Sequence, residues 1–327
     1  MGVRSACPFA CGVTHLAEPI GIFMRPSQSA DPLELLTGEL RNFQDIVRHL
    51  VPLPGEIPSL EGIDVYGGTM PLNGAIGGDH IIYVDFKKRY DLAARIREAS
   101  LAGKTQVVAN LERCRHKAGI AVIDVSGHQV TDALLAAMLH QAFLLGALYE
   151  LEIFGQITRR LFENLNSRFY HSSSRSKFVT MIYGEIAYDT TFRFLSAAHP
   201  PPVVFSNYHE RFMEVSRDLC TSFPPIGTLP SNDVIDRRMT DSSLGFKERY
   251  QLNEWTLMGV GDILLLYTDG LLDHTRGSEE YFPQHLERVV REVKHRSAKA
   301  IFEAIQMSAL DFAAPSDDIS VVVIKRT

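Results

Sequence analysis

Apolar residues recur at helical spacing in several stretches of the chain. In the stretch 33–50, Leu36, Leu40 and Val47 fall on one face of a helix, and Pro52 stops the run. This pattern predicts an amphipathic helix, whose apolar face serves either core packing or dimerisation. The same spacing predicts helices at 132–151, 157–169, 283–294 and 298–310, and two shorter helices fit the charged stretch 90–116.

Continuous or alternating apolar runs predict strands between these helices. They occur at 63–70, 81–86, 119–124, 178–186, 192–198, 202–205, 250–257, 263–267 and 319–324. We expect 63–70 and 81–86 to form a hairpin, and the three strands between 178 and 205 to form an antiparallel meander. The run at 119–124 is apolar throughout, as is typical of a strand buried on both faces.

The order of elements predicts one main domain. Residues 1–32 have the composition of an N-terminal arm or linker, 33–52 of an entry helix, and 53–327 of a single domain with a helical insert at 90–116. No internal repeat or change in composition divides the main domain.

Composition restricts the class of protein. With 45% hydrophobic and 22% charged residues the chain has the make-up of a globular protein, and a net charge of -6 without basic clusters argues against nucleic-acid partners. We expect no membrane span, because no apolar run approaches about 20 residues. Four cysteines are too few for a disulfide framework, which favours the cytoplasm. A zinc site at Cys7, Cys11 and His15 is disfavoured against a plain tail.

Acidic residues stand at the ends of four predicted strands. They are Asp79 after two glycines, Asp124, Asp269 before Gly270, and the pair Asp317-Asp318. A single Asp-Gly pair usually marks a turn, but four strand-end acids in one chain are a stronger pattern. Carboxylates are the hard oxygen ligands that Mg²⁺ and Mn²⁺ prefer. Two such ions can activate a water molecule for attack on phosphorus, so we expect two ions, Mn²⁺ or Mg²⁺.

The motifs around these acids resemble those of the PPM-type (protein phosphatase 2C-like) serine/threonine phosphatases, in the RsbU and SpoIIE branch. Seven segments carry the resemblance in the family's order: Gln44 with Leu50-Val-Pro52, Gly77-Gly-Asp79, Ile123-Asp-Val-Ser-Gly-His128, Phe178-Val-Thr180, Ala197-Ala-His-Pro-Pro201, Gly261-Asp-Ile-Leu-Leu-Leu-Tyr-Thr-Asp-Gly270 and Ser316-Asp-Asp-Ile-Ser320. The resemblance implies an α/β (α+β) fold, an α-β-β-α sandwich of two mostly antiparallel sheets flanked by helices.

The resemblance also implies roles for single residues. Asp124 would bridge both metals beside the backbone carbonyl of Val125, and Asp79 would ligate or orient metal-bound water at the second ion. Asp269 and Asp317 would hold the first ion, with Asp318 as the fallback for Asp317. A metal-bridging hydroxide would then be the nucleophile. His128, His199 and Gly270 are accessory candidates, the two histidines as general acids or, in preference, as residues that shape their turns.

The implied function is a metal-dependent serine/threonine protein phosphatase in bacterial signalling. Its substrate would be a phosphorylated regulatory protein of the anti-sigma-factor antagonist type, and the 33–50 helix is a candidate for homodimerisation.

Two departures from the family pattern keep an alternative open. Gln129 replaces a glycine, and Ile82 stands where an acid is usual, with Asp85 further along the chain. The alternative is a catalytically weak or inactive phosphatase-like module that binds a phosphoprotein. A nucleotide cyclase, suggested by Gly77-Gly-Asp79 alone, fits poorly because His80 and Ile81 follow.

Overall fold

The computed structural model describes residues 32–48, 56–72, 77–127, 130–172, 177–232, 242, 244–256 and 259–327. The chain divides into two compact units, Met1–Asn42 and Phe43–Thr327. The division falls inside helix α1 (Pro32–Arg48). The presence of α1 confirms the amphipathic helix predicted for this stretch. Most of the predicted N-terminal arm, with Cys7 and Cys11, lies outside the described residues.

Two mostly antiparallel sheets packed face to face form the centre of the second unit. Sheet A has the order β1-β13-β10-β6-β7 and comprises β1 (Ile63–Met70), β13 (Ile319–Arg326), β10 (Ile263–Tyr267), β6 (Val203–Ser206) and β7 (Arg211–Met213). Sheet B has the order β2-β3-β4-β5-β8, with β9 also paired to β5. It comprises β2 (His80–Asp85), β3 (Lys117–Val125), β4 (Val179–Ala187), β5 (Phe192–Ala197), β8 (Ser222–Phe223) and β9 (Asn253–Trp255).

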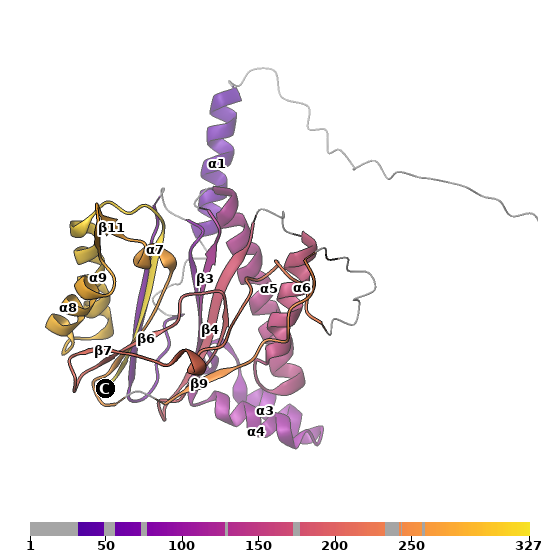
Figure 1. The fold of residues 1–327 in the computed structure, drawn as a ribbon. Helices are drawn as coiled ribbons and strands as arrows, with labels where there is room; N and C mark the ends of the chain where they lie inside the picture. The colour runs from indigo at the N-terminus through magenta and orange to yellow at the C-terminus, as the bar shows by residue number, and fades with distance from the viewer. Residues whose placement is uncertain are drawn as a thin grey trace, which may run out of the picture. The chain divides into compact units, whose positions relative to one another are not determined.

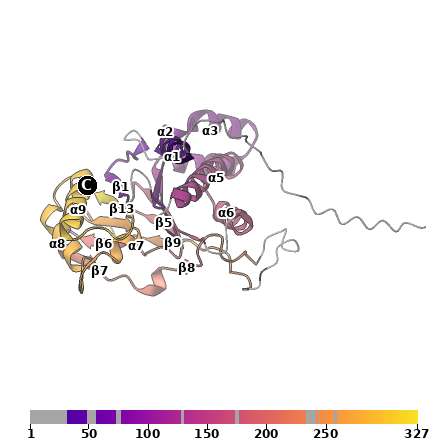
Figure 2. The same ribbon diagram turned by 90° about the horizontal axis from the view of Figure 1, so that it is seen from above.

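Helices cover the outer face of each sheet. The helices on the sheet A side are α8 (Gln284–Val293) and α9 (Ala298–Phe312), and those on the sheet B side are α3 (Leu92–Leu101), α4 (Thr105–Cys114), α5 (Val130–Phe154) and α6 (Arg159–Ser172). Figure 1 shows these layers side by side, and Figure 2 shows the same order from above. The predicted α-β-β-α sandwich is therefore confirmed.

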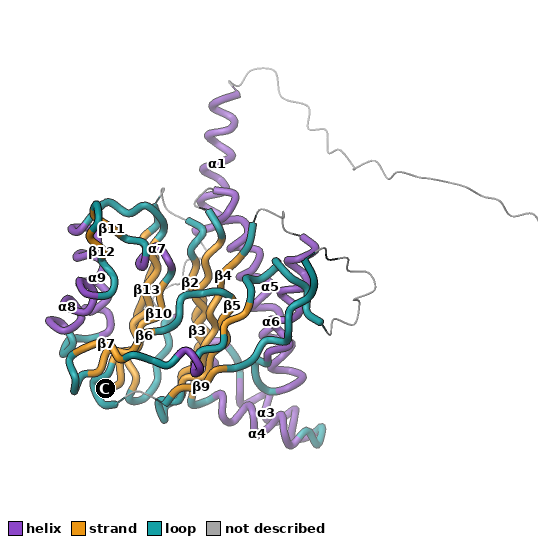
Figure 3. The backbone as a smooth tube through the Cα atoms, viewed as in Figure 1, coloured by secondary structure: helices purple, strands orange, loops and turns teal. Residues whose placement is uncertain are grey.

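Short elements complete the described chain. They are the helices α2 (Phe86–Arg89) and α7 (Asp269–Leu272), the 3-10 turn η2 (Arg217–Leu219), and the two-stranded pair β11 (Thr275–Arg276) with β12 (Glu279–Glu280). The tube in Figure 3 shows that the strands fill the space between the two helical layers.

The continuous apolar runs in the sequence follow from burial of both faces of each sheet. In β2, Ile81 packs in the core between the sheets, while Ile82 packs in the core beneath the sheet B helices. In β10, Leu264 faces the other sheet and Leu265 faces α8 and α9. Because successive side chains of a strand point to opposite faces, a strand covered on both sides needs an apolar residue at every position.

Two predicted strand pairings are wrong. The strand β1 pairs with β13 in sheet A, whereas β2 pairs with β3 in sheet B, so the expected hairpin does not form. The predicted meander also breaks, because β4 and β5 pair in sheet B but β6 pairs with β10 in sheet A. Local turn signals cannot distinguish a hairpin from a crossover between two packed sheets, since both need a short connection between buried strands.

Helix α5 is more apolar than the sequence analysis allowed. The segment Asp132–Phe154 is long and apolar enough to cross a membrane by length and composition, which contradicts the expectation that no run approaches that length. Buried helices of soluble proteins pass the same test, and 39% of the qualifying window is buried in this structure. The buried positions, such as Leu139 and Phe143, pack in the core beneath sheet B.

Candidate metal centre

The four predicted acids lie at one end of the two packed sheets. Asp79 immediately precedes β2, and Asp124 is the penultimate residue of β3. These two strands are antiparallel neighbours. Asp269 follows β10 and Asp317 precedes β13, which are also antiparallel neighbours. Because neighbouring strands run in opposite directions, the start of one lies beside the end of the other.

A hydrogen-bond network joins the two sheets at this end. The Thr268 hydroxyl, at the end of β10, donates to the Asp79 carboxylate over 2.7 Å. The same hydroxyl oxygen accepts the backbone N–H of Ser320 over 2.9 Å. Thr268 therefore links sheet A to the acid in front of β2. Sequence reasoning had given this threonine no role, although it stands within the motif that ends in Asp269.

The acids raise one another's pKa. Burial and the charges of Asp269 and Asp317 raise the pKa of Asp124 to about 7. Burial, and then the Asp124 charge, raises the pKa of Asp79 well above its usual value. Burial and the Asp317 charge raise the pKa of Asp269. The four carboxylates thus form one connected group of like charges, drawn from both sheets.

Asp317 and Asp318 differ in what surrounds them. The Asp318 carboxylate is buried and accepts the backbone N–H groups of Leu72 over 2.6 Å and Gly78 over 2.7 Å. Asp317 is only partly buried, and its charge raises the pKa of both Asp124 and Asp269. The Asp318 charge also contributes to the raised pKa of Asp79 and of Asp124. Both acids are therefore coupled to the cluster, Asp317 through Asp124 and Asp269 and Asp318 through Asp79 and Asp124, and Asp318 in addition ties two loops together.

Close backbone approach explains the glycines of these motifs. A Cβ on Gly77 would lie 1.9 Å from an Asp318 carboxylate oxygen, and a Cβ on Gly78 would lie 2.7 Å from the carbonyl oxygen of Val125. A Cβ on Gly270 would lie 2.0 Å from the Asp318 carbonyl oxygen. Side chains at these positions would force the acidic loops apart. Gly270 accordingly has a packing role, and the Val125 carbonyl lies beside the Gly78 backbone.

One of the two accessory histidines lies behind Asp124. His199 is buried, and its Nδ1 atom forms a hydrogen bond of 2.9 Å with the Thr180 hydroxyl. That hydroxyl also donates to Asp124, over 3.4 Å. Burial lowers the pKa of His199 to about 3, so the ring is neutral near pH 7 and holds no extra proton to donate. Thr180, another residue that sequence reasoning left without a role, connects this histidine to Asp124. His128 and Gln129 lie outside the described residues.

Ile82, one of the two departures from the family pattern, and Asp85 have structural roles. Ile82 is almost fully buried and packs in the core beneath the sheet B helices, where an acid would lack a partner. Asp85 lies at the far end of β2 and does not replace the missing acid. Its carboxylate caps α2 by accepting the backbone N–H groups of Lys87 and Lys88.

The donor chemistry of the acid group fits a hard divalent cation. Carboxylates that raise one another's pKa are stabilised by positive charge, and none of Asp79, Asp124, Asp269 and Asp317 has an ion pair within the part of the chain that the structure describes. In these same described ranges no three His, Cys, Asp or Glu side chains are drawn together closely enough to hold an ion by themselves. The fit therefore rests on ligand type and shared charge.

Comparison with known proteins identifies the family of the chain. Residues 115–327, more than half of its length, match the family model described as Stage II sporulation protein E (SpoIIE). The chain belongs to the SpoIIE family. It is 28% identical over 164 residues to the phosphoserine phosphatase RsbP of Bacillus subtilis, an alignment that covers 49% of this chain and 34% of RsbP. The chain thus spans about a third of the length of that relative.

Solved structures show the same fold. The SiaA PP2C domain of Pseudomonas aeruginosa aligns with a TM-score of 0.58 at 15% identity, covering 90% of this SpoIIE-family chain and 97% of that domain. The RsbU and RsbW domains of a Mycobacterium tuberculosis protein align with a TM-score of 0.58 at 18% identity, covering 84% and 64%. The PP2C phosphatase domain of SpoIIE from Bacillus subtilis, with a fragment of its regulatory domain, aligns with a TM-score of 0.56 at 15% identity. The alignment covers 81% of this chain and 64% of that one.

Family and fold confirm the predicted class. They are those of the PPM-type phosphatases of the RsbU and SpoIIE branch, the group of phosphoprotein phosphatases that the sequence motifs indicated.

Proposed function

We propose that this chain is a metal-dependent serine/threonine protein phosphatase that acts on a phosphorylated regulatory protein. One observation carries the proposal. In a chain of the SpoIIE family, Asp124 interacts electrostatically with acids from both sheets, and its pKa is raised to about 7. Perturbed carboxylates that gather without cationic partners are typical of functional sites. Membership of the family gives them a reaction, hydrolysis of a phosphate ester.

The proposed ligands are Asp79, Asp124, Asp269 and Asp317, with the Val125 carbonyl beside Asp124. Two Mn²⁺ or Mg²⁺ ions, when bound, would supply positive charge to the phosphate and activate the attacking water. Asp124 is the proposed shared ligand, because its pKa responds to the charges of Asp269 and Asp317 and its own charge acts on Asp79. Thr268 and Thr180 orient Asp79 and Asp124 through their hydroxyl groups. His199 acts through Thr180 as a positioning residue.

The substrate class rests on the family alone. RsbP carries the name phosphoserine phosphatase, which supports a phosphoserine or phosphothreonine substrate for this chain. We extend this to a small regulatory protein of the anti-sigma-factor antagonist type, in the cytoplasm, where the free thiols of Cys114 and Cys220 would stay reduced. Dimerisation through the 33–50 helix belongs to the same proposal, since α1 is amphipathic.

Turnover of p-nitrophenyl phosphate and of a phosphoserine peptide, with and without Mn²⁺, tests the proposed function. We expect hydrolysis that needs the metal, is lost in Asp124→Asn, and is unchanged in Asp311→Asn, a matched control at an exposed aspartate on α9. A folded wild-type protein that binds the phosphopeptide without hydrolysing it would contradict the enzyme and favour the phosphoprotein-binding module.

A further inference from the structure

A cavity lies at the opposite end of sheet B from the acids. It has a volume of about 480 Å³ and is lined by residues from α4, the start of β3, the end of β4, the start of β5 and the turn after α5. The strand β3 runs from Lys117 in this cavity to Asp124, which separates the two sites by roughly 23 Å at the rise of an extended strand. Its volume is in the range that small-molecule ligands occupy.

The floor of the cavity is an ion pair with no free acceptor. Lys117 donates to one carboxylate oxygen of Glu185 over 2.6 Å, and the Tyr183 hydroxyl donates to the other over 2.9 Å. The two charged side chains are only 15% and 14% exposed. Since both oxygens of Glu185 are engaged and its charge is matched by Lys117, the floor has little net charge to repel an anion.

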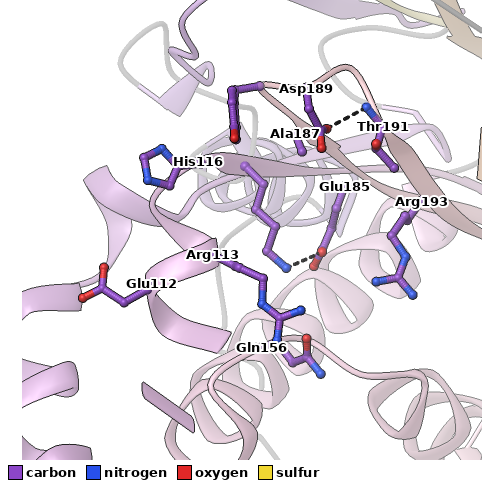
Figure 4. Close-up of a pocket in the computed structure, with 11 residues that line it drawn as sticks. Glu112, Arg113, His116, Gln156, Glu185, Ala187, Asp189, Thr191 and Arg193 are labelled. Atoms are coloured by element: carbon purple, nitrogen blue, oxygen red, sulfur yellow. Dashed lines mark hydrogen bonds and ion pairs between the residues drawn. The ribbon is translucent and has the colours of Figure 1, made fainter. Parts of the chain in front are cut away.

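Donor groups surround this floor. Figure 4 shows the side chains of Arg113, Gln156 and Arg193 near Glu185, and the three residues come from α4, the turn after α5 and β5. Arg113 donates to Asn110 over 2.6 Å and has no ion pair with an acid among the described residues. Arg193 contacts Glu254 over 2.9 Å through its Nε atom, in a pair in which both side chains are more than half exposed. Arginine carries five N–H donors, so both guanidinium groups retain donors for a ligand.

The two other acids of the lining have one partner each among the described residues. Glu112 pairs with Arg115 over 2.9 Å, and Asp189 accepts the backbone N–H of Thr191 over 3.0 Å inside its turn. The rings of His116 and Tyr188 meet edge to face at 5.5 Å along one side, and Tyr188 is 61% exposed. The cavity therefore offers two guanidinium groups, one amide and an aromatic surface.

We propose that this cavity, between the α4 helix of the insert and the far end of sheet B, binds a small organic anion that carries a carboxylate or phosphate group beside a planar ring. Arg113 and Arg193 hold the anionic group, because planar guanidinium groups match carboxylate and phosphate oxygens in pairs. Tyr188 and His116 contact the ring. The site is separate from the acids of the proposed metal centre and does not depend on phosphatase activity.

Titration of the metal-free 327-residue chain with benzoate and with phenylphosphonate tests the site. Fluorescence of Trp255, the one tryptophan of the chain, reports binding, because its neighbour Glu254 contacts Arg193. We expect saturable binding of at least one anion and none of benzyl alcohol. Preference for benzoate would identify a carboxylate ligand, and preference for phenylphosphonate a phosphate ligand.

Variants assign the binding to the cavity. Arg113→Ala and Arg193→Ala are expected to weaken binding about tenfold each, the effect of losing a charge-assisted hydrogen bond. Arg97→Ala, on α3 of the same insert, and Asp124→Asn, at the other end of β3, should bind as the wild type does. Glu254→Gln should bind more tightly, since it frees Arg193. Absence of saturable binding, or equal binding by both cavity variants and the wild type, overturns the proposal.

Discussion

The two ends of strand β3 differ in how their charged side chains are paired. At its start Lys117 and Glu185 form a partly buried ion pair, and the Tyr183 hydroxyl completes the partners of the carboxylate. At its end Asp124 faces Asp269 and Asp317 with no cation paired to it among the described residues, and burial with these charges raises its pKa to about 7. The same strand therefore carries an ion pair at its start and, at its end, an acid that belongs to a cluster of like charges.

Because of this difference, we expect mutations at the two ends of β3 to affect different properties, stability at one end and activity at the other. A buried charge that is paired and hydrogen-bonded contributes to a defined fold, whereas buried charges of one sign oppose folding until a cation joins them. The start of β3 is accordingly expected to respond to mutation through stability. The end of β3 is expected to respond through activity, and its metal-free form should gain stability when a charge is removed.

Exchange of the two neighbouring acids for asparagine is expected to give the largest effect. Asp317→Asn should lower metal-dependent turnover more than about 100-fold, because loss of a proposed direct ligand exceeds the effect of losing an outer-shell partner. Its metal-free melting temperature should stay equal to that of the wild type or rise, since one repelling charge is gone. Turnover of p-nitrophenyl phosphate and thermal unfolding measure the two effects.

Asp318→Asn is the matched control for that change. It should lower the free energy of unfolding by about 2 kcal/mol, because the Asp318 carboxylate accepts the N–H groups of Leu72 and Gly78. The reverse result, with activity lost in Asp318→Asn and stability lost in Asp317→Asn, would identify Asp318 as the metal ligand instead.

Loss of the cation at the start of β3 is expected to act on stability and not on turnover. Lys117→Ala leaves Glu185 partly buried without its counter-ion and should lower the free energy of unfolding by about 3 kcal/mol, measured in urea. Lys299→Ala, which removes one side of an exposed pair with Glu303 at 3.8 Å, should change it by less than about 0.5 kcal/mol. Equal effects of the two changes would show that the β3 pair is no more important than a surface contact.

A pair of buried histidines near Asp79 should make the metal-free protein sensitive to acid. His80 and His140 form a hydrogen bond of 2.5 Å, and burial with neighbouring charges lowers their pKa values to about 3 and about 4. Their folded-state pKa values lie below the unfolded value of about 6.5, so their contribution is complete above that pH and is lost as the pH falls towards 4.

The measurement uses urea unfolding at pH 7 and pH 5 in an Asp124→Asn background. That background is needed because the raised pKa of Asp124 acts with the opposite sign, so its contribution to stability falls as pH rises from about 4 through about 7. His140→Gln should lose less stability between pH 7 and pH 5 than its parent does. An identical loss in both would remove this histidine as a source of acid sensitivity.

Removal of one orienting hydroxyl is expected to give the smallest effect. Thr180→Val deletes the hydroxyl between Asp124 and His199 and should lower turnover about tenfold, in line with the loss of one hydrogen bond to a charged group. Thr180→Ser should restore most of the activity, because it keeps the hydroxyl. If Thr180→Ser were as impaired as Thr180→Val, the methyl packing of the threonine would be the cause.

The sequence by itself determined the elements, the acids and the family. Helices α5, α8 and α9 follow from apolar periodicity, and the strand β13 from its continuous apolar run. Asp79, Asp124 and Asp269 were found because glycine and aspartate directly after or before a buried strand mark a close turn with a hard ligand. These are local patterns, and local interactions specify them.

Only the tertiary structure decided which strands pair and how the two neighbouring acids, Asp317 and Asp318, differ in their surroundings. Pairing of β1 with β13 depends on contacts across more than 250 residues of sequence, which no local pattern records. The choice of Asp317 depends on the two backbone N–H groups that occupy Asp318, and the role of Thr268 on the meeting of two sheets. The cavity at the far end of β3 also arises only where α4 and three strands come together, because its arginines lie far apart in the sequence until packing makes them neighbours.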